Sequence, residues 1–161
     1  MFEKKNNTFL IFILFFISAS LVAALIIQYV LGHAPCKLCL YERIPYIISI
    51  FLIIQIILFK KYKKTILFVL ALIFAASTIL SFYHFGIEQG FFNELSVCES
   101  NNLSGKLTKE ELIKELSKTN ISCKDVSFRI MGLSLASINT MFSFILSYIF
   151  TRLFLNYGKN R

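Results

Sequence analysis

The sequence predicts an all-α integral membrane protein, a four-helix bundle with a long outer loop that carries a short amphipathic helix. Composition gives the first indication, because 57% of the 161 residues are hydrophobic and only 16% are charged, whereas soluble domains carry about 25% charged residues. The mean hydropathy of +0.70 agrees with this. The second indication is the presence of four apolar runs that reach the roughly 20 residues needed to cross a bilayer. We expect residues 1–161 to form a single membrane domain.

Four predicted spans follow one another along the chain, and each is apolar on all sides, as a helix that faces lipid must be. They cover about residues 8–31, 40–59, 65–85 and 130–150. The first run is far longer than the roughly 7–15 apolar residues of a signal peptide, so we expect it to remain as a span. The loops on the side away from the termini are then about 32–39 and 86–129.

The placement of lysine and arginine predicts the orientation, because cytoplasmic segments of membrane proteins are enriched in these residues. The N-terminus, the 60–64 connection and the C-terminal tail, taken with Glu3, carry the whole net charge of +8. The two opposite loops balance to zero. Both termini are therefore predicted to be cytoplasmic, and the positive charge needs no nucleic-acid partner to explain it.

All four cysteines, Cys36, Cys39, Cys98 and Cys123, fall in or beside the predicted outer loops. Disulfides persist on that side of the membrane and not in the cytoplasm, and an even count predicts two of them. The C-x-x-C spacing of the first pair suits a small reducible disulfide or a metal site. We expect no metal, because the second pair is too widely separated to complete a zinc site of four thiolates.

Cys98 and Cys123 flank a predicted helix over about residues 108–118. Thr108 can cap its start, with Glu111 three residues later and Leu107 packing against the first turn. This helix would lie on the membrane surface or pack on the end of the bundle. A disulfide across it would stabilise the loop by about 3.5 kcal/mol, so a purely structural bridge is the alternative interpretation of this pair.

Three ionisable residues lie near the ends of the predicted spans. Arg43 comes one helical turn after Cys39, where it could hold Cys39 as a thiolate or serve only as an interfacial anchor. His84 shares a helix face with Glu88 and is either a functional residue or a hydrogen-bonded structural one. Glu42 is expected to pair with Lys37 or with solvent, and we assign it no role.

Residues 35–43, Pro-Cys-Lys-Leu-Cys-Leu-Tyr-Glu-Arg, open the second predicted span and resemble the DsbB family of disulfide-generating membrane quinone reductases. Residues 83–89, which hold Tyr-His and Glu-Gln, resemble the family's segment at the end of the third helix. Residues 128–135 resemble the start of its fourth helix, and the outer loop matches through its two cysteines. The resemblance covers most of the chain, apart from the sequence between Cys98 and Cys123.

The resemblance implies a relay of thiol–disulfide exchange. A reduced DsbA-like thioredoxin-fold partner would attack a Cys98–Cys123 disulfide and form a mixed disulfide with Cys98. Cys123 would then attack Cys36. Cys39 would leave as the thiolate that donates electrons to a membrane quinone, either ubiquinone or menaquinone.

The resemblance also implies cofactor-binding residues and a location. Arg43 would lie beside the Cys39 thiolate and the quinone ring, and His84 would lie near the quinone. The protein would be a multi-pass protein of the bacterial inner (cytoplasmic) membrane, with its cysteines in the periplasm.

Two alternatives remain open. A relative of vitamin K epoxide reductase would also be a helical bundle with a C-x-x-C pair, but there the pair lies late in the bundle, whereas here it comes first. A membrane scaffold with two structural disulfides would be non-catalytic, and its disulfides would resist reduction.

Overall fold

The computed structural model describes residues 2–59, 62–93, 123, 129–130 and 132–159. In chain order the elements are α1 (Phe2–Tyr29), α2 (Lys37–Tyr41), α3 (Ile44–Leu58), α4 (Lys63–Glu88), β1 (Arg129–Ile130), β2 (Leu133–Ser134) and α6 (Leu135–Lys159). The stretches long and apolar enough to cross a membrane are Asn7–Tyr29, Lys37–Leu58, Lys63–Glu88 and Leu135–Tyr157. The predicted fold class, an all-α membrane bundle of four spans, is confirmed. The predicted helix over 108–118 lies outside the described residues.

The outer surface of the bundle is apolar. Every span exposes large hydrophobic side chains, among them Phe15 of α1, Phe51 of α3, Ile79 of α4 and Phe144 of α6. A continuous exposed apolar surface of this kind is unfavourable in water and neutral in lipid hydrocarbon. The protein is therefore a multi-pass membrane protein, as predicted.

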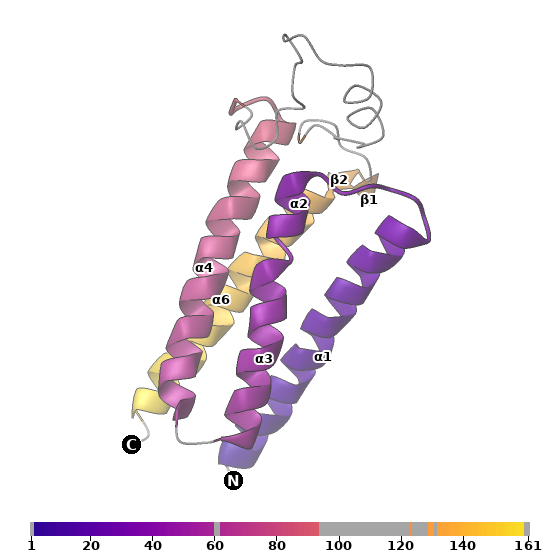
Figure 1. Cartoon of the computed structure of the whole chain (residues 1–161). Helices are drawn as coiled ribbons and strands as arrows, with labels where there is room; N and C mark the ends of the chain where they lie inside the picture. Colours follow the sequence, from indigo (N-terminus) through magenta and orange to yellow (C-terminus); the bar gives the residue numbers. More distant parts are fainter. Residues whose placement is uncertain (1, 60–61, 94–122, 124–128, 131, 160–161) are drawn as a thin grey trace, which may run out of the picture.

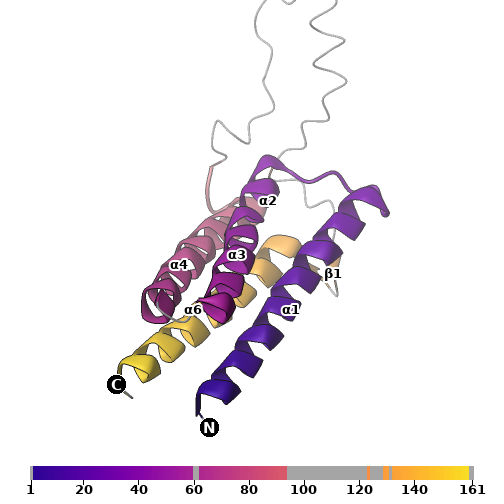
Figure 2. The same ribbon diagram turned by 60° about the horizontal axis from the view of Figure 1, so that its bottom comes forward.

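The helices form a bundle in which α3 and α6 lie between α1 and α4 (Figures 1 and 2). The start of α1 and the end of α6 lie at one end of the bundle, and α2 lies at the other (Figure 1). Lys63 and Lys64 begin α4 at the end that holds the termini. The cysteine pair of α2 is thus separated from this positive charge by the length of the bundle.

The closest packing is between α4 and α6. Small polar residues line this contact: Ser77 and Ser143 approach within 3.1 Å through their hydroxyl oxygens, and the Ser147 hydroxyl donates to the Ala71 carbonyl. Small side chains let transmembrane helices approach closely, and their hydroxyls hydrogen-bond across the interface. This contact holds α4 and α6 together along the bundle.

The second span is not one helix beginning near residue 40, as the hydropathy predicted. It begins at Lys37, and α2 and α3 are separated at Glu42 and Arg43. Pro45 sits in the first turn of α3. It has no backbone N–H to donate to the carbonyl four residues earlier, and its ring disfavours a continuous helix through that point. The break places the Glu42 side chain inside the bundle, where it is 7% exposed.

The fourth span also begins later than predicted, at Leu135 instead of 130, and α6 continues to Lys159. Before it, β1 and β2 pair in antiparallel fashion, with Ile130 opposite Leu133. Gly132 adopts a φ of 83°, a conformation that glycine allows. Ser134 then caps α6, because its hydroxyl accepts the Ser137 backbone N–H.

Candidate active site

Cys36 and Cys39 form a reduced, hydrogen-bonded pair at the start of α2. Cys36 is the N-cap residue, and its Sγ accepts the backbone N–H of Cys39 at 3.3 Å. The two Sγ atoms lie 2.7 Å apart, and both cysteines are free. The prediction that this pair sits where the second span begins is confirmed.

The contacts around the pair favour negative charge on Cys36. Cys36 is buried, and His84 of α4 places Nε2 at 3.5 Å from its Sγ. The pKa of the Cys36 thiol is held well below its usual range, first by the hydrogen bond from Cys39 and then by the imidazole of His84, despite the opposing effect of burial. Because the thiolate is the reactive form of cysteine, this lowered pKa makes Cys36 a reactive sulfur of the reduced pair.

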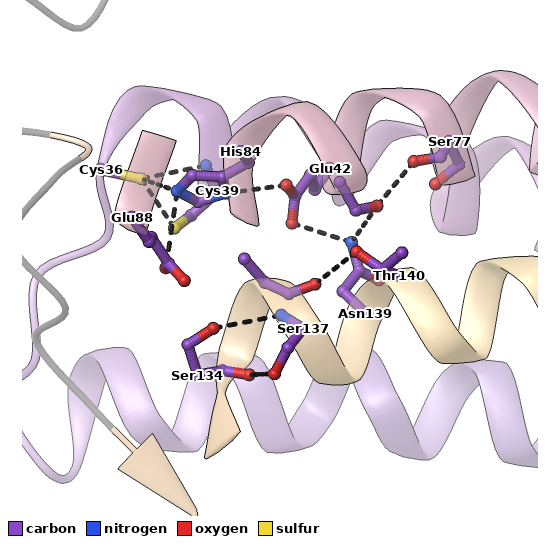
Figure 3. Close-up of polar contacts among 12 residues, drawn as sticks. Cys36, Cys39, Glu42, Ser77, His84, Glu88, Ser134, Ser137, Asn139 and Thr140 are labelled. Carbon is purple, nitrogen blue, oxygen red and sulfur yellow. Dashed lines mark hydrogen bonds and ion pairs between the residues drawn. The ribbon is translucent and has the colours of Figure 1, made fainter. Parts of the chain in front are cut away.

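His84 is held in place by a carboxylate. Its ring is almost completely buried, and Nδ1 lies 2.8 Å from Oε1 of Glu42 (Figure 3). Because a carboxylate accepts, Nδ1 carries the proton of this bond and Nε2 faces Cys36. The expectation that Glu42 pairs with Lys37 or with solvent is wrong, since the break before Pro45 turns Glu42 toward α4.

Asn139 of α6 connects this group to the bundle core. Its amide Nδ2 donates to Oε2 of Glu42 at 2.8 Å and to the Ser81 hydroxyl at 3.1 Å. Its carbonyl accepts the phenolic hydroxyl of Tyr46, which also contacts Ser143. Both oxygens of the buried Glu42 carboxylate are thus satisfied, as a polar group at this depth requires.

Glu88 approaches the same group from the end of α4. Its Oε1 lies 3.9 Å from Nε2 of His84, and its Oε2 is buried with no hydrogen-bond partner among the described residues. The prediction that His84 and Glu88 share a helix face is confirmed. The imidazole therefore lies between two carboxylates, Glu42 on Nδ1 and Glu88 beside Nε2.

An apolar cavity of about 260 Å³ opens beside Cys39. It lies between α1, the α2–α3 break and α6, and the polar residues of its wall include Cys39, Glu42, Arg43 and Asn139. Arg43 also donates from Nη1 to Oε1 of Gln28 in α1 at 2.6 Å. Cys39 and Arg43 thus line the same cavity.

His84 does not line this cavity. It lies on the other side of the pair, against Cys36 and Glu42. The structure therefore divides the predicted cofactor residues, with Arg43 at the cavity and His84 at the buried sulfur.

Cys123 packs in the same cluster as the pair. It is 2% exposed and is disulfide-bonded. The cluster contains Cys36, Leu38 and Ile87 as its other buried members. Cys98 lies outside the described residues. A disulfide-bonded cysteine therefore shares a buried cluster with the reduced C-x-x-C pair, and thiol–disulfide exchange requires such sulfurs to approach one another.

Glu42, Asn139 and Tyr46 are the site residues that sequence reasoning missed. The sequence held a signal for Glu42 and Asn139, because acidic and amide side chains within apolar spans are expected to face the bundle interior and pair with each other. Their partners were not predictable, because the pairing depends on the break at Pro45 and on the contact between α4 and α6.

Comparison with known proteins agrees with this site. The sequence model of the family described as "Disulfide bond formation protein DsbB" matches residues 6–152. "Uncharacterized protein RP370" of Rickettsia prowazekii (strain Madrid E) is 29% identical over 161 residues, which cover 97% of this chain and 93% of that protein.

Proposed function

Since that match covers most of the chain, the protein belongs to the DsbB family, and from this premise we propose that it oxidises a DsbA-like thioredoxin-fold protein and passes the electrons to a membrane quinone. Membership implies disulfide bond formation by a membrane oxidoreductase. The dithiol partner, the quinone and the order of the steps are the proposal.

One observation carries the proposal: disulfide-bonded Cys123 lies in the same buried cluster as free Cys36, while Cys39 faces an apolar cavity. In the proposed order the partner's thiolate attacks a Cys98–Cys123 disulfide at Cys98, so that Cys123 leaves as a thiolate. Cys123 then attacks a Cys36–Cys39 disulfide at Cys36, and Cys39 is released toward the cavity. Each step exchanges one thiolate for another and conserves electrons.

The residues of the cavity fit a quinone. Its wall is mostly apolar, which suits a membrane-soluble ring, and Arg43 supplies a permanent positive charge beside Cys39. When bound, a quinone would supply the two-electron acceptor that the side chains lack. Arg43 would orient its ring through a carbonyl oxygen, and Gln28 holds the guanidinium in that position.

His84 and Glu42 act at Cys36, the other sulfur of the pair. The second thiolate of the partner would displace Cys98, so that the partner leaves with its own disulfide. Cys98 would then attack Cys123 of the Cys36–Cys123 disulfide, and Cys36 would leave as a thiolate. Nε2 of His84 lies where it can give or take the proton of that thiol, and the Glu42 carboxylate fixes the ring. We assign His84 to proton handling at Cys36 and Arg43 to the quinone.

We also propose that the cysteines are periplasmic and both termini cytoplasmic, in the bacterial inner membrane. Two positions support this orientation: Lys63 and Lys64 begin α4 at one end of the bundle, and the cysteine pair lies with α2 at the other end. Positively charged ends remain in the cytoplasm, and disulfides persist on the opposite side.

The test is steady-state quinone reduction by the purified full-length protein with a reduced thioredoxin-fold dithiol, followed by quinone absorbance. Cys98→Ser should abolish turnover with the protein partner. Arg43→Gln should raise KM for the quinone, while Arg152→Gln, an exposed arginine near the end of α6, serves as its matched control and should change nothing. A Cys98→Ser protein with normal turnover, or no turnover by the unmodified protein, would overturn the proposal. The second result is the one expected of a scaffold with structural disulfides.

A further inference from the structure

We propose that the reduced Cys36–Cys39 pair, together with His84 and Glu88, is a binding site for one thiophilic divalent cation of the zinc type. The sequence predicted no metal, because the second cysteine pair is too widely separated to complete a site of four thiolates. The structure supplies a different set of donors, two thiolates, one imidazole and one carboxylate, from α2, its N-cap and the end of α4.

The first three donors already lie together. The Sγ atoms of Cys36 and Cys39 and a ring nitrogen of His84 all lie within 4.8 Å of one another. Cysteine and histidine are the ligands that zinc prefers, in a tetrahedral arrangement. All three side chains come from helix ends that are held by the bundle, so the arrangement does not depend on an exposed loop.

Glu88 supplies an independent indication of a ligand. Its side chain is 7% exposed, and its Oε1 lies 3.9 Å from Nε2 of His84. Its Oε2 is buried and has no hydrogen-bond partner in the part of the chain that the structure describes. An unpaired buried carboxylate oxygen costs free energy unless a cation or a donor satisfies it. A metal ion between Cys36, Cys39 and His84 would satisfy it as the fourth ligand.

The contact of Glu42 with His84 matches the support that metal-bound histidines require. The ring nitrogen that does not bind a metal usually donates to a carboxylate, which fixes the ring and increases the basicity of the binding nitrogen. Nδ1 of His84 makes this contact with Glu42 at 2.8 Å. Nε2 is thereby directed to the sulfur pair.

The distances are close to a tetrahedral site. With Zn–S of about 2.3 Å and Zn–N of about 2.0 Å, tetrahedral geometry places sulfur and nitrogen about 3.5 Å apart and two sulfurs about 3.8 Å apart. The Cys36 Sγ to His84 Nε2 distance is 3.5 Å, whereas the two sulfurs are at 2.7 Å. A rotation of the Cys39 side chain that moves its Sγ by about 1 Å would separate the two sulfurs enough to admit the ion.

Binding would depend on the redox state. The two thiols lose their protons to become ligands, and a Cys36–Cys39 disulfide offers no thiolate at all. The ion would therefore bind only the reduced pair. A bound ion would also withhold both sulfurs from thiol–disulfide exchange and so inhibit the enzyme. This inhibition rests on the proposed function, whereas binding itself does not.

The test uses full-length Cys98→Ser/Cys123→Ser protein, in which Cys36 and Cys39 are the remaining cysteines. Titration of the reduced, metal-free protein with Co²⁺ should give thiolate-to-cobalt charge-transfer bands and tetrahedral ligand-field bands that saturate at one ion per chain, and Zn²⁺ should remove them. The same protein with the pair oxidised is the first control and should show no bands. Absence of these bands in the reduced protein would overturn the proposal.

Variants identify the ligands. His84→Ala and Glu88→Gln should weaken binding and alter the ligand-field bands, and Glu42→Gln should weaken it about 10–100-fold. His33→Ala removes the other histidine of the chain and should bind as before. Equal binding by all four variants would show a two-sulfur site and would overturn the assignment. The titration needs neither quinone nor partner, so a protein that binds Co²⁺ in this way but reduces no quinone loses only the proposed function.

Discussion

Cys36 owes its reactivity to hydrogen bonds from two directions. Cys39 donates to its sulfur from the same turn, and His84 faces it from α4. These contacts compensate for burial, which alone would make a thiolate unfavourable. The first contact is local to the C-x-x-C turn, whereas the second depends on how α4 lies beside α2.

The lowered pKa of Cys36 predicts how its alkylation depends on pH. In the reduced Cys98→Ser/Cys123→Ser protein, Cys36 should react with iodoacetamide at pH values well below those at which an ordinary thiol reacts. The rate should fall only when the pH passes down through the lowered pKa, because only the thiolate reacts. Mass spectrometry of the Cys36 peptide measures this.

Cys39→Ala is the informative variant, because it removes the largest cause of the shift. Its Cys36 alkylation midpoint should move upward toward that of a free thiol. An unchanged midpoint in Cys39→Ala would show that the hydrogen bond between the sulfurs does not set the reactivity.

At the scale of elements, the spans were predictable and their interruptions were not. Hydropathy located four spans because a bilayer requires a minimum length of apolar helix. It did not distinguish the short β1–β2 hairpin from the apolar start of the fourth span, nor did it show the break between α2 and α3. Both features depend on single residues, Gly132 and Pro45, whose backbone restrictions have little effect on an averaged hydropathy.

The end of α4 is closed by a folded-back segment. Gly90 adopts a φ of 77°, and the backbone N–H of Phe91 donates to the Gly86 carbonyl at 2.8 Å. The Phe92 ring then stacks on Tyr83 with ring centroids 5.4 Å apart. A Cβ at Gly86 would clash with the Phe92 ring, so glycine at this position allows the segment to pack against the end of α4.

Gly86→Ala should therefore have opposite effects in two backgrounds. In the unmodified protein it should lower the melting temperature, because the Phe92 ring must leave Tyr83. In a Phe92→Ala background the clash is absent, and the higher helix propensity of alanine should stabilise the protein by about 1 kcal/mol. Thermal unfolding in detergent measures both. The same sign in both backgrounds would contradict the packing described for Phe92.

At the scale of the whole molecule, the bundle separates two ends with different chemistry. One end holds the start of α4 with Lys63, which donates to Asn7 at 3.2 Å, and the other holds the cysteine pair, His84 and Glu88. The separation was predictable from the positions of lysine and cysteine along the chain. The polar connection from Cys36 to Asn139 was not, because it joins α2, α4 and α6 in space.

The orientation of these ends predicts which positions can be labelled from outside the cell. In a cysteine-free background, Phe91→Cys and Tyr62→Cys place single exposed thiols at opposite ends of the bundle. A membrane-impermeant maleimide should label the first but not the second in cells with a permeable outer membrane. Lysis should then allow both to react. Labelling of the Tyr62→Cys protein alone in unlysed cells would reverse the proposed topology.

The central claim is that the Cys36–Cys39 pair gives its electrons to a quinone in the cavity beside Cys39. The direct measurement is a single turnover without oxygen, in which reduced, quinone-free Cys98→Ser/Cys123→Ser protein is mixed with a stoichiometric amount of ubiquinone or menaquinone. We predict the loss of one equivalent of quinone absorbance together with the loss of both thiols, and no change in a protein that also carries Cys36→Ser. Unchanged absorbance of both quinones, with both thiols still free, would contradict the account.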